Sequence, residues 1–272
     1  MFRVGTNIIG VGCNGALAVS RVVDSGVAGA RYIGVSAGDN AGFDVCCEGR
    51  NGFVEICHTL FPAQNRLAFV VADGGDRVDA ALACEICAVA KAMDAMTVAV
   101  MYMPSSRTEA YTEAEEYLEE LHEVADGVVV INCGYAPDFG VEISMLFTML
   151  SNAMDSAGAK RICTNDDLAD VFATERNIYF ASVASHIDMD SHEYLAESLS
   201  MRLDSQMHID IASNFTYFIS CGGLMPKELF SRYVNAVNKK NIAYMPSKRA
   251  YVYENNPDYA DGSFLFGVLC SQ

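Results

Sequence analysis

The chain has 272 residues, of which 51% are hydrophobic and 19% are charged. This length supports a large core in one or two domains, and the composition excludes a disordered chain. The 35 acidic residues outnumber the 18 Lys and Arg residues, so the net charge is −17. Such a chain repels nucleic-acid phosphates and anionic lipids, and we expect neither nucleic-acid binding nor direct membrane contact. The lack of a signal peptide and of a membrane-length apolar run predicts a cytoplasmic protein.

The ten Cys residues follow no disulfide framework, and we expect them to be reduced. Cys84 and Cys87 have the C-x-x-C spacing, but a zinc site needs a second pair, and none follows at a suitable distance. Two Cys residues three positions apart on a helix share one face, so both are expected in the core. No metal site is predicted.

The first half of the chain alternates strands with helices. Strands are expected at residues 7–12, 32–36, 54–57, 67–72, 96–101 and 127–132. Helices are expected at residues 16–24, 79–93, 108–125 and 141–154. The last helix is apolar enough to be a central element, and the Glu-rich side of helix 108–125 should be solvated. This alternation predicts a parallel sheet covered by helices on both faces.

The second half predicts a smaller sheet with its own helices. Helices are expected at residues 167–174, 191–203 and 227–238, and strands at residues 178–184, 215–220, near Tyr244, 250–254 and 263–270. The last two strands should form a hairpin. The predicted fold class is α/β. It comprises a Rossmann-like parallel-sheet domain (residues 1–139), a central helix and connector (140–164), and a mixed-sheet α+β domain (165–272).

A glycine-rich loop between the first strand and the first helix matches G-x-G-x-x-G. Its candidate nucleotide-binding residues are Gly10, Gly12, Cys13, Asn14 and Gly15. Glycines let the backbone approach a phosphate, and the following helix N-terminus offers N–H groups and a positive dipole end. Two interpretations stay open, a nucleotide site and a tight turn without a ligand.

A dinucleotide-dependent Rossmann enzyme is one alternative that this loop permits. Such an enzyme also needs an acid at the end of the second strand to hold a ribose, where this chain has Ser36, with Asp39 slightly later. It further needs a catalytic acid or base in the second half. His186, His192 and His208 are scattered there without a partner spacing that indicates a site.

The order of the segments resembles FtsZ, the tubulin-like GTPase. Residues 10–19 resemble the first glycine loop of that family, and residues 90–104 its helix-to-strand stretch before a turn with Pro. The most specific match is the N-D-D-L-A-D-V segment at residues 165–171, which resembles the FtsZ loop N-x-D-F-A-D-V. The resemblance covers nearly the whole chain and identifies it as a divergent FtsZ-like member of the tubulin/FtsZ superfamily.

The resemblance implies a GTP-binding domain, a central helix and a smaller C-terminal domain, in monomers that stack head to tail. The acidic loop of one subunit then completes the GTPase site of the next. Asn165, Asp167 and Asp170 occupy the catalytic positions of that loop, where carboxylates can orient a water or a cation. The alternative is structural, because Asn165 and Asp166 also suit the N-terminus of the following helix.

The phosphate-binding signature of the family is broken. FtsZ has G-G-G-T-G-T-G after the fourth strand. Here Gly74 and Gly75, the remaining candidate nucleotide-binding positions, are followed by Asp76 and Asp79. Each carboxylate would stand about 4–6 Å from a phosphate and cost on the order of 1 kcal/mol or more. The same acids suit an empty helix end as a cap and as dipole partners.

Two further departures bear on the function. The segment at residues 44–66 is shorter than the FtsZ segment that holds a phosphate-sensing loop and a helix, and we expect no room for both. Phe139 and Gly140 resemble the start of the FtsZ central helix, but Glu142 and the residues after it do not match its guanine contacts.

The sequence therefore predicts an FtsZ-like cytoskeletal or cell-division-related protein with weak or absent GTP hydrolysis. It would assemble with itself head to tail or with an FtsZ-type partner. GTP or GDP is the one cofactor that the resemblance suggests. The alternatives are an active GTPase with a remodelled site and the dinucleotide-dependent enzyme.

Overall fold

The computed structural model describes residues 2, 5–36, 42–61, 67–105, 108–132, 138–155, 162–174, 176–206, 214–238 and 247–271. Within these ranges, the strands are β1 (Thr6–Val11), β2 (Ala30–Val35), β3 (Val45–Cys47), β4 (Leu67–Asp73), β5 (Met96–Met103), β6 (Gly127–Asn132), β7 (Asn177–His186), β8 (Asn214–Cys221), β9 (Ser247–Tyr253) and β10 (Ser263–Ser271). The helices are α1 (Gly12–Asp24), α2 (Gly49–Leu60), α3 (Arg77–Ala92), α4 (Glu109–Val124), α5 (Phe139–Met154), α6 (Asn165–Phe172), α7 (His192–Gln206) and α8 (Lys227–Asn238).

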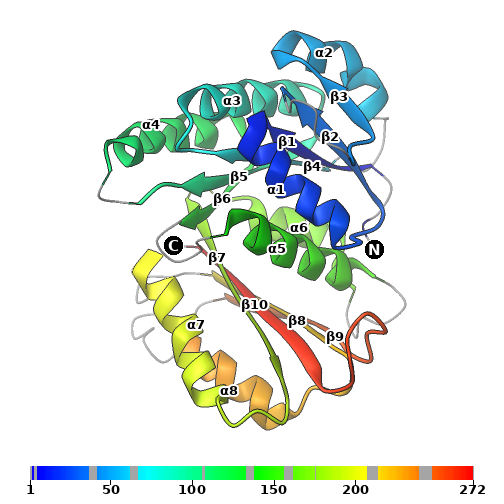
Figure 1. Cartoon of the computed structure of the whole chain (residues 1–272), viewed down its shortest axis with the longest axis vertical. Coiled ribbons are helices and arrows are strands. Elements are labelled where there is room, and N and C mark those ends of the chain that lie inside the picture. The colour runs from blue at the N-terminus through cyan, green and yellow to red at the C-terminus, as the bar shows by residue number, and fades with distance from the viewer. Residues whose placement is uncertain are drawn as a thin grey trace.

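The strands form one ten-stranded sheet in the order β3-β2-β1-β4-β5-β6-β7-β10-β8-β9. Strands β1 to β6 pair in parallel, as the sequence predicts. Helices α2, α3 and α4 cover one face of this part of the sheet, and α1, α5 and α6 cover the other (Figure 1). Strands such as β4 are buried along almost their whole length because helices cover both faces.

One predicted strand is wrong. Residues 54–57 lie in helix α2, and the short strand β3 precedes it at the sheet edge. Phe53, Cys57 and Leu60 are the buried residues of α2, at the i, i+4 and i+7 spacing of a helix face. The segment before β4 therefore holds a helix of 12 residues.

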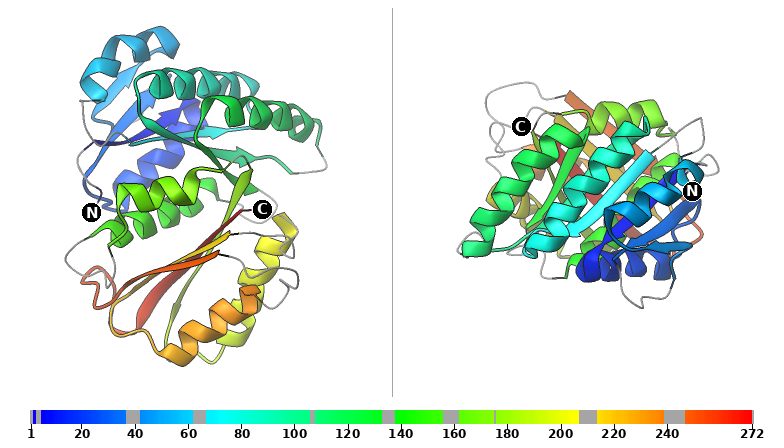
Figure 2. Two further views of the ribbon diagram at one scale, coloured as in Figure 1. Left: turned by 180° about the vertical axis from the view of Figure 1, so that it is seen from behind. Right: turned by 90° about the horizontal axis from the view of Figure 1, so that it is seen from above.

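The centre of the molecule is helix α5, which lies between two parts of the sheet (Figures 1 and 2). Eleven of its 16 residues are buried. One apolar cluster joins Phe147 and Leu150 of α5 to Phe69 of β4 and to Phe218 and Leu265 of the C-terminal strands. The predicted central helix is confirmed.

Strands β7 to β10, with α7 and α8 on their outer face, form what we call the C-terminal half; the chain up to β6 is the N-terminal half. The predicted hairpin of the last two strands is wrong, because β10 pairs with β7 and β8 while β9 pairs with β8 in parallel. The stretch between β9 and β10 instead bonds to β8, since Asn256 donates to Ser220 Oγ (2.8 Å) and to the Cys221 carbonyl (2.8 Å). Tyr244, the other predicted strand, lies outside the described residues.

The two halves also pair directly through their strands. Residues 128–130 of β6 align in parallel with residues 177–179 of β7. Nε2 of His122 in α4 lies 2.8 Å from Oδ1 of Asn177 across the same boundary. The domain limits at residues 139 and 164 stay a prediction, since hydrogen-bonded strands run across this part of the chain.

Two glycines set how closely α1 approaches the sheet. A Cβ at Gly10 would lie 2.7 Å from the Cα of Ala16, and a Cβ at Gly15 would collide with the Val71 carbonyl oxygen of β4. Both neighbours are backbone atoms, which cannot rotate away as a side chain can. These positions therefore need glycine for helix–sheet packing alone.

We expect Gly15→Ala to lower the free energy of unfolding by about 2–3 kcal/mol, because the new methyl group must displace the β4 backbone. The measurement is urea unfolding followed by circular dichroism. Gly26→Ala is the matched control. Gly26 has φ +75° with no atom near its missing Cβ, so the loss should be about 1 kcal/mol, from backbone strain alone. Equal losses in the two variants would contradict the packing role of Gly15.

Candidate functional site

The predicted glycine loop is the start of helix α1 rather than a separate loop. The helix begins at Gly12, four residues before its predicted start, and Gly12 has φ +67°. Cys13 and Asn14 are exposed in this first turn. The turn lies at the carboxyl edge of the parallel strands, beside the start of α3, as a phosphate site of this type requires.

A carboxylate of the chain occupies the space over Gly12. The side chain of Asp79, from the first turn of α3, lies where a Cβ of Gly12 would stand. Asp79 is only 9% exposed. The missing side chain of Gly12 therefore lets another group approach its backbone closely, and in this chain that group is the Asp79 carboxylate.

The environment of Asp79 disfavours its charge. Burial, followed by the charges of Asp76 and Asp73, raises the pKa of the Asp79 carboxyl to about 6. A phosphate entering beside it would add further negative charge to this group of acids. Arg77, the nearest cation along α3, is exposed and interacts with Tyr117 and Glu113 of α4.

The backbone donors at Gly74 and Gly75 are already used. The Gly74 N–H donates to the Tyr102 carbonyl of β5 (2.8 Å), and the Gly75 N–H donates to the Asp73 carboxylate (2.9 Å). The Asp76 N–H donates to the Asp73 carbonyl (3.3 Å). A phosphate at this turn would have to displace these bonds.

The first turn of α3 is satisfied in the same way. Asp76 is its N-cap, and its carboxylate accepts from the N–H groups of Val78 (2.9 Å) and Asp79 (3.3 Å). The Ala80 N–H donates to the Asp76 carbonyl (2.9 Å). The expectation that this acid would cap the helix is confirmed, and the positive end of the helix dipole already faces carboxylates.

A cleft of about 310 Å³ stays open beside this edge, between α1 and the first turn of α5. It is lined by Asn14, Leu17, Ala18, Arg21, Asp73, Tyr102, Asp138, Phe139 and Gly140. The rings of Tyr102 and Phe139 stack with their centroids 4.6 Å apart. The side-chain amide of Asn14 donates to the Asp73 carboxylate (2.8 Å), and Nη2 of Arg21 lies 3.8 Å from the Asp138 carboxylate. Phe139 and Gly140 open the central helix, as predicted.

The acidic loop lies at the start of α6, where Asp167 forms a capping box with Thr164. The Asp167 carboxylate accepts from the Thr164 N–H (2.9 Å) and hydroxyl (2.8 Å), and the Asp167 N–H donates to Thr164 Oγ1 (3.1 Å). The N-cap is therefore Thr164, where the sequence analysis placed capping on Asn165 and Asp166. Asn165 is the first residue of α6.

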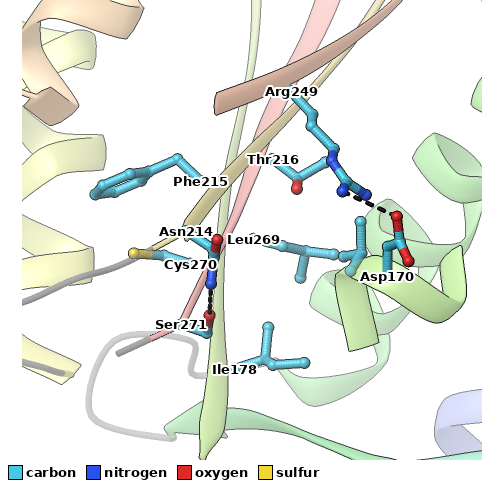
Figure 3. Close-up of a pocket in the computed structure, with 10 residues that line it drawn as sticks. Asp170, Ile178, Asn214, Phe215, Thr216, Arg249, Leu269, Cys270 and Ser271 are labelled. Atoms are coloured by element: carbon cyan, nitrogen blue, oxygen red, sulfur yellow. Dashed lines mark hydrogen bonds and ion pairs between the residues drawn. The ribbon is translucent and has the colours of Figure 1, made fainter. Parts of the chain in front are cut away.

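Asp170 is held by a cation from the C-terminal half. Its carboxylate accepts from Arg249 Nη2 of β9 at 3.0 Å (Figure 3). The side chain of Asp170 is 64% exposed and that of Arg249 is 30% exposed. The hollow beside the pair has a volume of about 30 Å³, room for roughly one water.

The cleft and the acidic loop lie at opposite ends of the central helix. The cleft is at the first turn of α5, and α6 follows its last turn. A helix of 16 residues is about 24 Å long, so Asp167 and Asp170 do not reach the cleft within one chain. Only a second molecule could bring the two sets of residues together.

Sequence reasoning missed Asp73 and Arg249. Asp73 ends the buried strand β4 at the carboxyl edge, and an acid at that position is a signal that could have been found. Arg249 lies 79 residues from Asp170 in a strand without a motif, so nothing local pointed to it. The roles of the predicted nucleotide-binding and catalytic residues stay predictions.

Several residues with reactive side chains belong to the core. Cys84 and Cys87 are buried in α3, as expected, and His192 is buried between Tyr233 Oη and the Ile187 carbonyl, both at 3.1 Å. Across the described ranges, no group of three or more His, Cys, Asp or Glu could hold a metal ion. No helix in those ranges has both the length and the apolar character to cross a membrane.

Comparison with solved structures finds the same fold in FtsZ and CetZ proteins. A point mutant of FtsZ from M. jannaschii gives a TM-score of 0.76 at 16% identity, over 99% of this chain and 91% of that chain. An empty FtsZ dimer from M. jannaschii gives 0.73 at 16% identity, over 100% and 89%. CetZ2 from Haloferax volcanii, a GTPγS-bound protofilament, gives 0.75 at 12% identity, over 98% and 93%.

By sequence, no protein-family model and no curated protein matches the chain. The structural likeness shows that the chain has the tubulin/FtsZ-like fold, with a mostly parallel sheet and helices on both faces. The α/β fold class predicted from the sequence is confirmed.

We expect Asp79→Asn to stabilise the protein at pH 7 by about 1–2 kcal/mol and to leave its stability unchanged near pH 4. The raised pKa means that the folded chain holds a proton that the unfolded chain loses, so stability falls as pH rises from about 4 to about 6. The variant removes this loss. Urea unfolding of both proteins at the two pH values measures the difference.

The control for this prediction is Glu116→Gln, which removes one exposed acid from α4. Its difference from the parent protein should not change between pH 4 and pH 7 by a comparable amount. A flat pH profile for the Asp79→Asn difference would show that the Asp79 carboxyl is not perturbed in the folded chain.

Proposed function

We propose that this chain is an FtsZ-like cytoskeletal or cell-division-related protein of the cytoplasm, which assembles without efficient GTP hydrolysis. It stacks head to tail with itself or with an FtsZ-type partner. One observation carries the proposal: groups of the chain itself occupy the carboxyl edge of the sheet, where a phosphate would bind. Asp79 covers Gly12, and the N–H groups at Gly74 and Gly75 donate to acceptors of the chain.

The cost of binding a triphosphate follows from this arrangement. Phosphate oxygens need N–H donors, and the donors at Gly74, Gly75 and the first turn of α3 would first have to leave an internal acceptor, which costs about 1–3 kcal/mol where it is left unpaired. The acids Asp73, Asp76 and Asp79 would then face the phosphates as like charges. Weak or absent nucleotide binding is the expected result.

The opposite placement of the cleft and the acidic loop supports assembly by stacking. A second chain would set its α6 over the cleft of the first. Two of the similar structures are described as an FtsZ dimer and a CetZ2 protofilament, so this fold supports contacts between copies. Asp167 in its capping box and Asp170 on Arg249 keep the loop folded, whether or not a nucleotide is hydrolysed.

An active GTPase with a remodelled site is the second candidate. The open cleft favours it, because the stacked rings of Tyr102 and Phe139 and the amide of Asn14 could contact a base. The dinucleotide-dependent enzyme meets the same obstacle as GTP, since it also needs phosphate contacts at Gly12.

We expect nucleotide-stripped protein to show no binding of GTP or GDP at millimolar concentration in calorimetry with Mg²⁺. Pelleting and electron microscopy should show assembly, alone or with FtsZ, that does not change when GTP is added. Micromolar binding with turnover that Asp170→Ala abolishes would favour the remodelled GTPase. Monomers under every condition, with and without an FtsZ partner, would overturn the assembly proposal.

We also expect salt to promote self-assembly. Stacking would bring Asp73 and Asp138 at the cleft toward Asp166 and Asp170 of the next chain, and the like charges repel. Screening lengths fall from about 30 Å at 0.01 M to about 8 Å at 0.15 M salt, so the critical concentration should fall over that range. Asp166→Asn, which removes an exposed charge from α6, should lower it about two- to fivefold at low salt.

The control for the salt prediction is Glu116→Gln, which makes the same charge change on the solvated side of α4. Equal effects of the two variants would mean that net charge alone governs association. Assembly that weakens as salt is added would argue against contact between these two acidic ends.

A further inference from the structure

A partly buried ion pair joins the central helix to the C-terminal half. Glu142, in the first turn of α5, accepts from Arg202 Nη2 of α7 at 2.5 Å. The side chain of Glu142 is 11% exposed and that of Arg202 is 23% exposed. No signal in the sequence pairs these residues, which are 60 positions apart.

Strand β7 completes the network around the pair. The hydroxyl of Ser182 donates to the second Glu142 oxygen at 3.3 Å, and Arg202 Nη1 donates to the Ser182 carbonyl at 2.8 Å. The two bonds of Glu142 cross from α5 to the C-terminal half, and the bond from Arg202 to Ser182 lies within that half. A buried ion pair offsets its desolvation only with geometry and additional bonds of this kind.

The surroundings of the pair are apolar. The next turns of α5 place Ile143, Leu146 and Met149 in the cluster that packs against both halves. Apolar contact is non-directional, and such a layer tolerates changes of angle at modest cost. The Arg202 guanidinium instead reaches two acceptors at once, Glu142 through Nη2 and the Ser182 carbonyl through Nη1, and these bonds are directional because they weaken with misalignment.

We infer that Glu142 and Arg202 are positioning residues that fix the orientation of the C-terminal half on helix α5. The N-terminal half already contacts α5 through α1, because Nη2 of Arg21 lies 3.8 Å from the carboxylate of Asp138, the N-cap of α5. The ion pair extends this attachment from the first turn of α5 to α7. The inference concerns the single chain and does not depend on the proposed assembly.

The pairing of β6 with β7 reports the orientation of the C-terminal half on helix α5. Residues 128–130 of β6 and 177–179 of β7 are the strand pairs that cross from one half to the other. If the C-terminal half changes its angle on α5, these pairs open first, whereas β1 and β4 lie wholly within the N-terminal half. Hydrogen exchange of the two groups of amides separates a change of orientation from a loss of global stability.

The experiment is hydrogen exchange with mass spectrometry on the full chain and on the double variant Glu142→Leu/Arg202→Met. Replacing both partners by apolar residues leaves no unpaired buried charge, so the fold should persist. We expect exchange at residues 128–130 and 177–179 to rise at least tenfold, with β1 and β4 within twofold of the parent protein. Exchange that is unchanged, or that rises equally in both groups, overturns the inference.

Two single variants complete the test. Arg202→Lys keeps the charge but loses the fork that reaches Glu142 and Ser182 together, so a smaller rise at the same residues is expected; the same criterion decides the outcome if the double variant does not fold. Lys91→Met is the matched control, because Lys91 pairs with Asp126 at 3.3 Å inside the N-terminal half. This variant should leave the difference in exchange between the β6–β7 amides and the β1 and β4 amides unchanged.

Discussion

Burial of helix α5 on opposite sides is the constraint on which the rest of this structure depends. Its 16 residues fill the layer between the N-terminal strands and the C-terminal strands, and an apolar cluster runs through that layer. The cleft lies at its first turn and the acidic loop follows its last turn, and a helix of 16 residues is about 24 Å long. Any chemistry that combines the two must involve two molecules.

At the carboxyl edge of the sheet, carboxylates of the chain itself satisfy the N–H groups around the start of helix α3. Backbone N–H groups at a helix N-terminus need acceptors, and an anion or a side chain can supply them. In this chain Asp73 and Asp76 supply them, and Asp79 fills the space over Gly12. The glycines at positions 10 and 15 have a packing role that needs no ligand, because a Cβ at Gly10 would meet the backbone of α1 and a Cβ at Gly15 would meet the backbone of β4.

The contact between the halves combines two kinds of interaction. The apolar layer around α5 supplies most of the attraction, since hydrophobic burial scales with area and not with direction. The Glu142–Arg202 pair, the Asp170–Arg249 pair and the β6–β7 strand pairing are directional, and each joins elements far apart in sequence. Bonds of this kind restrict the angle between two elements more than apolar contact does, because they weaken with misalignment.

Elements whose signals are local can be predicted from the amino-acid sequence. Buried strands such as β4 and the helices α4, α5 and α8 follow from apolar periodicity, and Asp76 caps α3 as its position suggests. The short helix α2 was read as a strand because residues 54–57 carry β-branched and apolar side chains, and the helical spacing of its buried face extends beyond that window.

Contacts between residues far apart in sequence follow from the folded arrangement alone. It inserted β10 between β7 and β8, where adjacency in sequence had suggested a hairpin, and it set Asp79 over Gly12 and Arg249 on Asp170. Hydrophobic periodicity reports which face of an element is buried, but it carries no information on the element that will cover that face. The choice of partner depends on how the layers close in three dimensions. The sequence therefore predicts the broken glycine signature and the cap at Asp76, but not the position of Asp79 over Gly12.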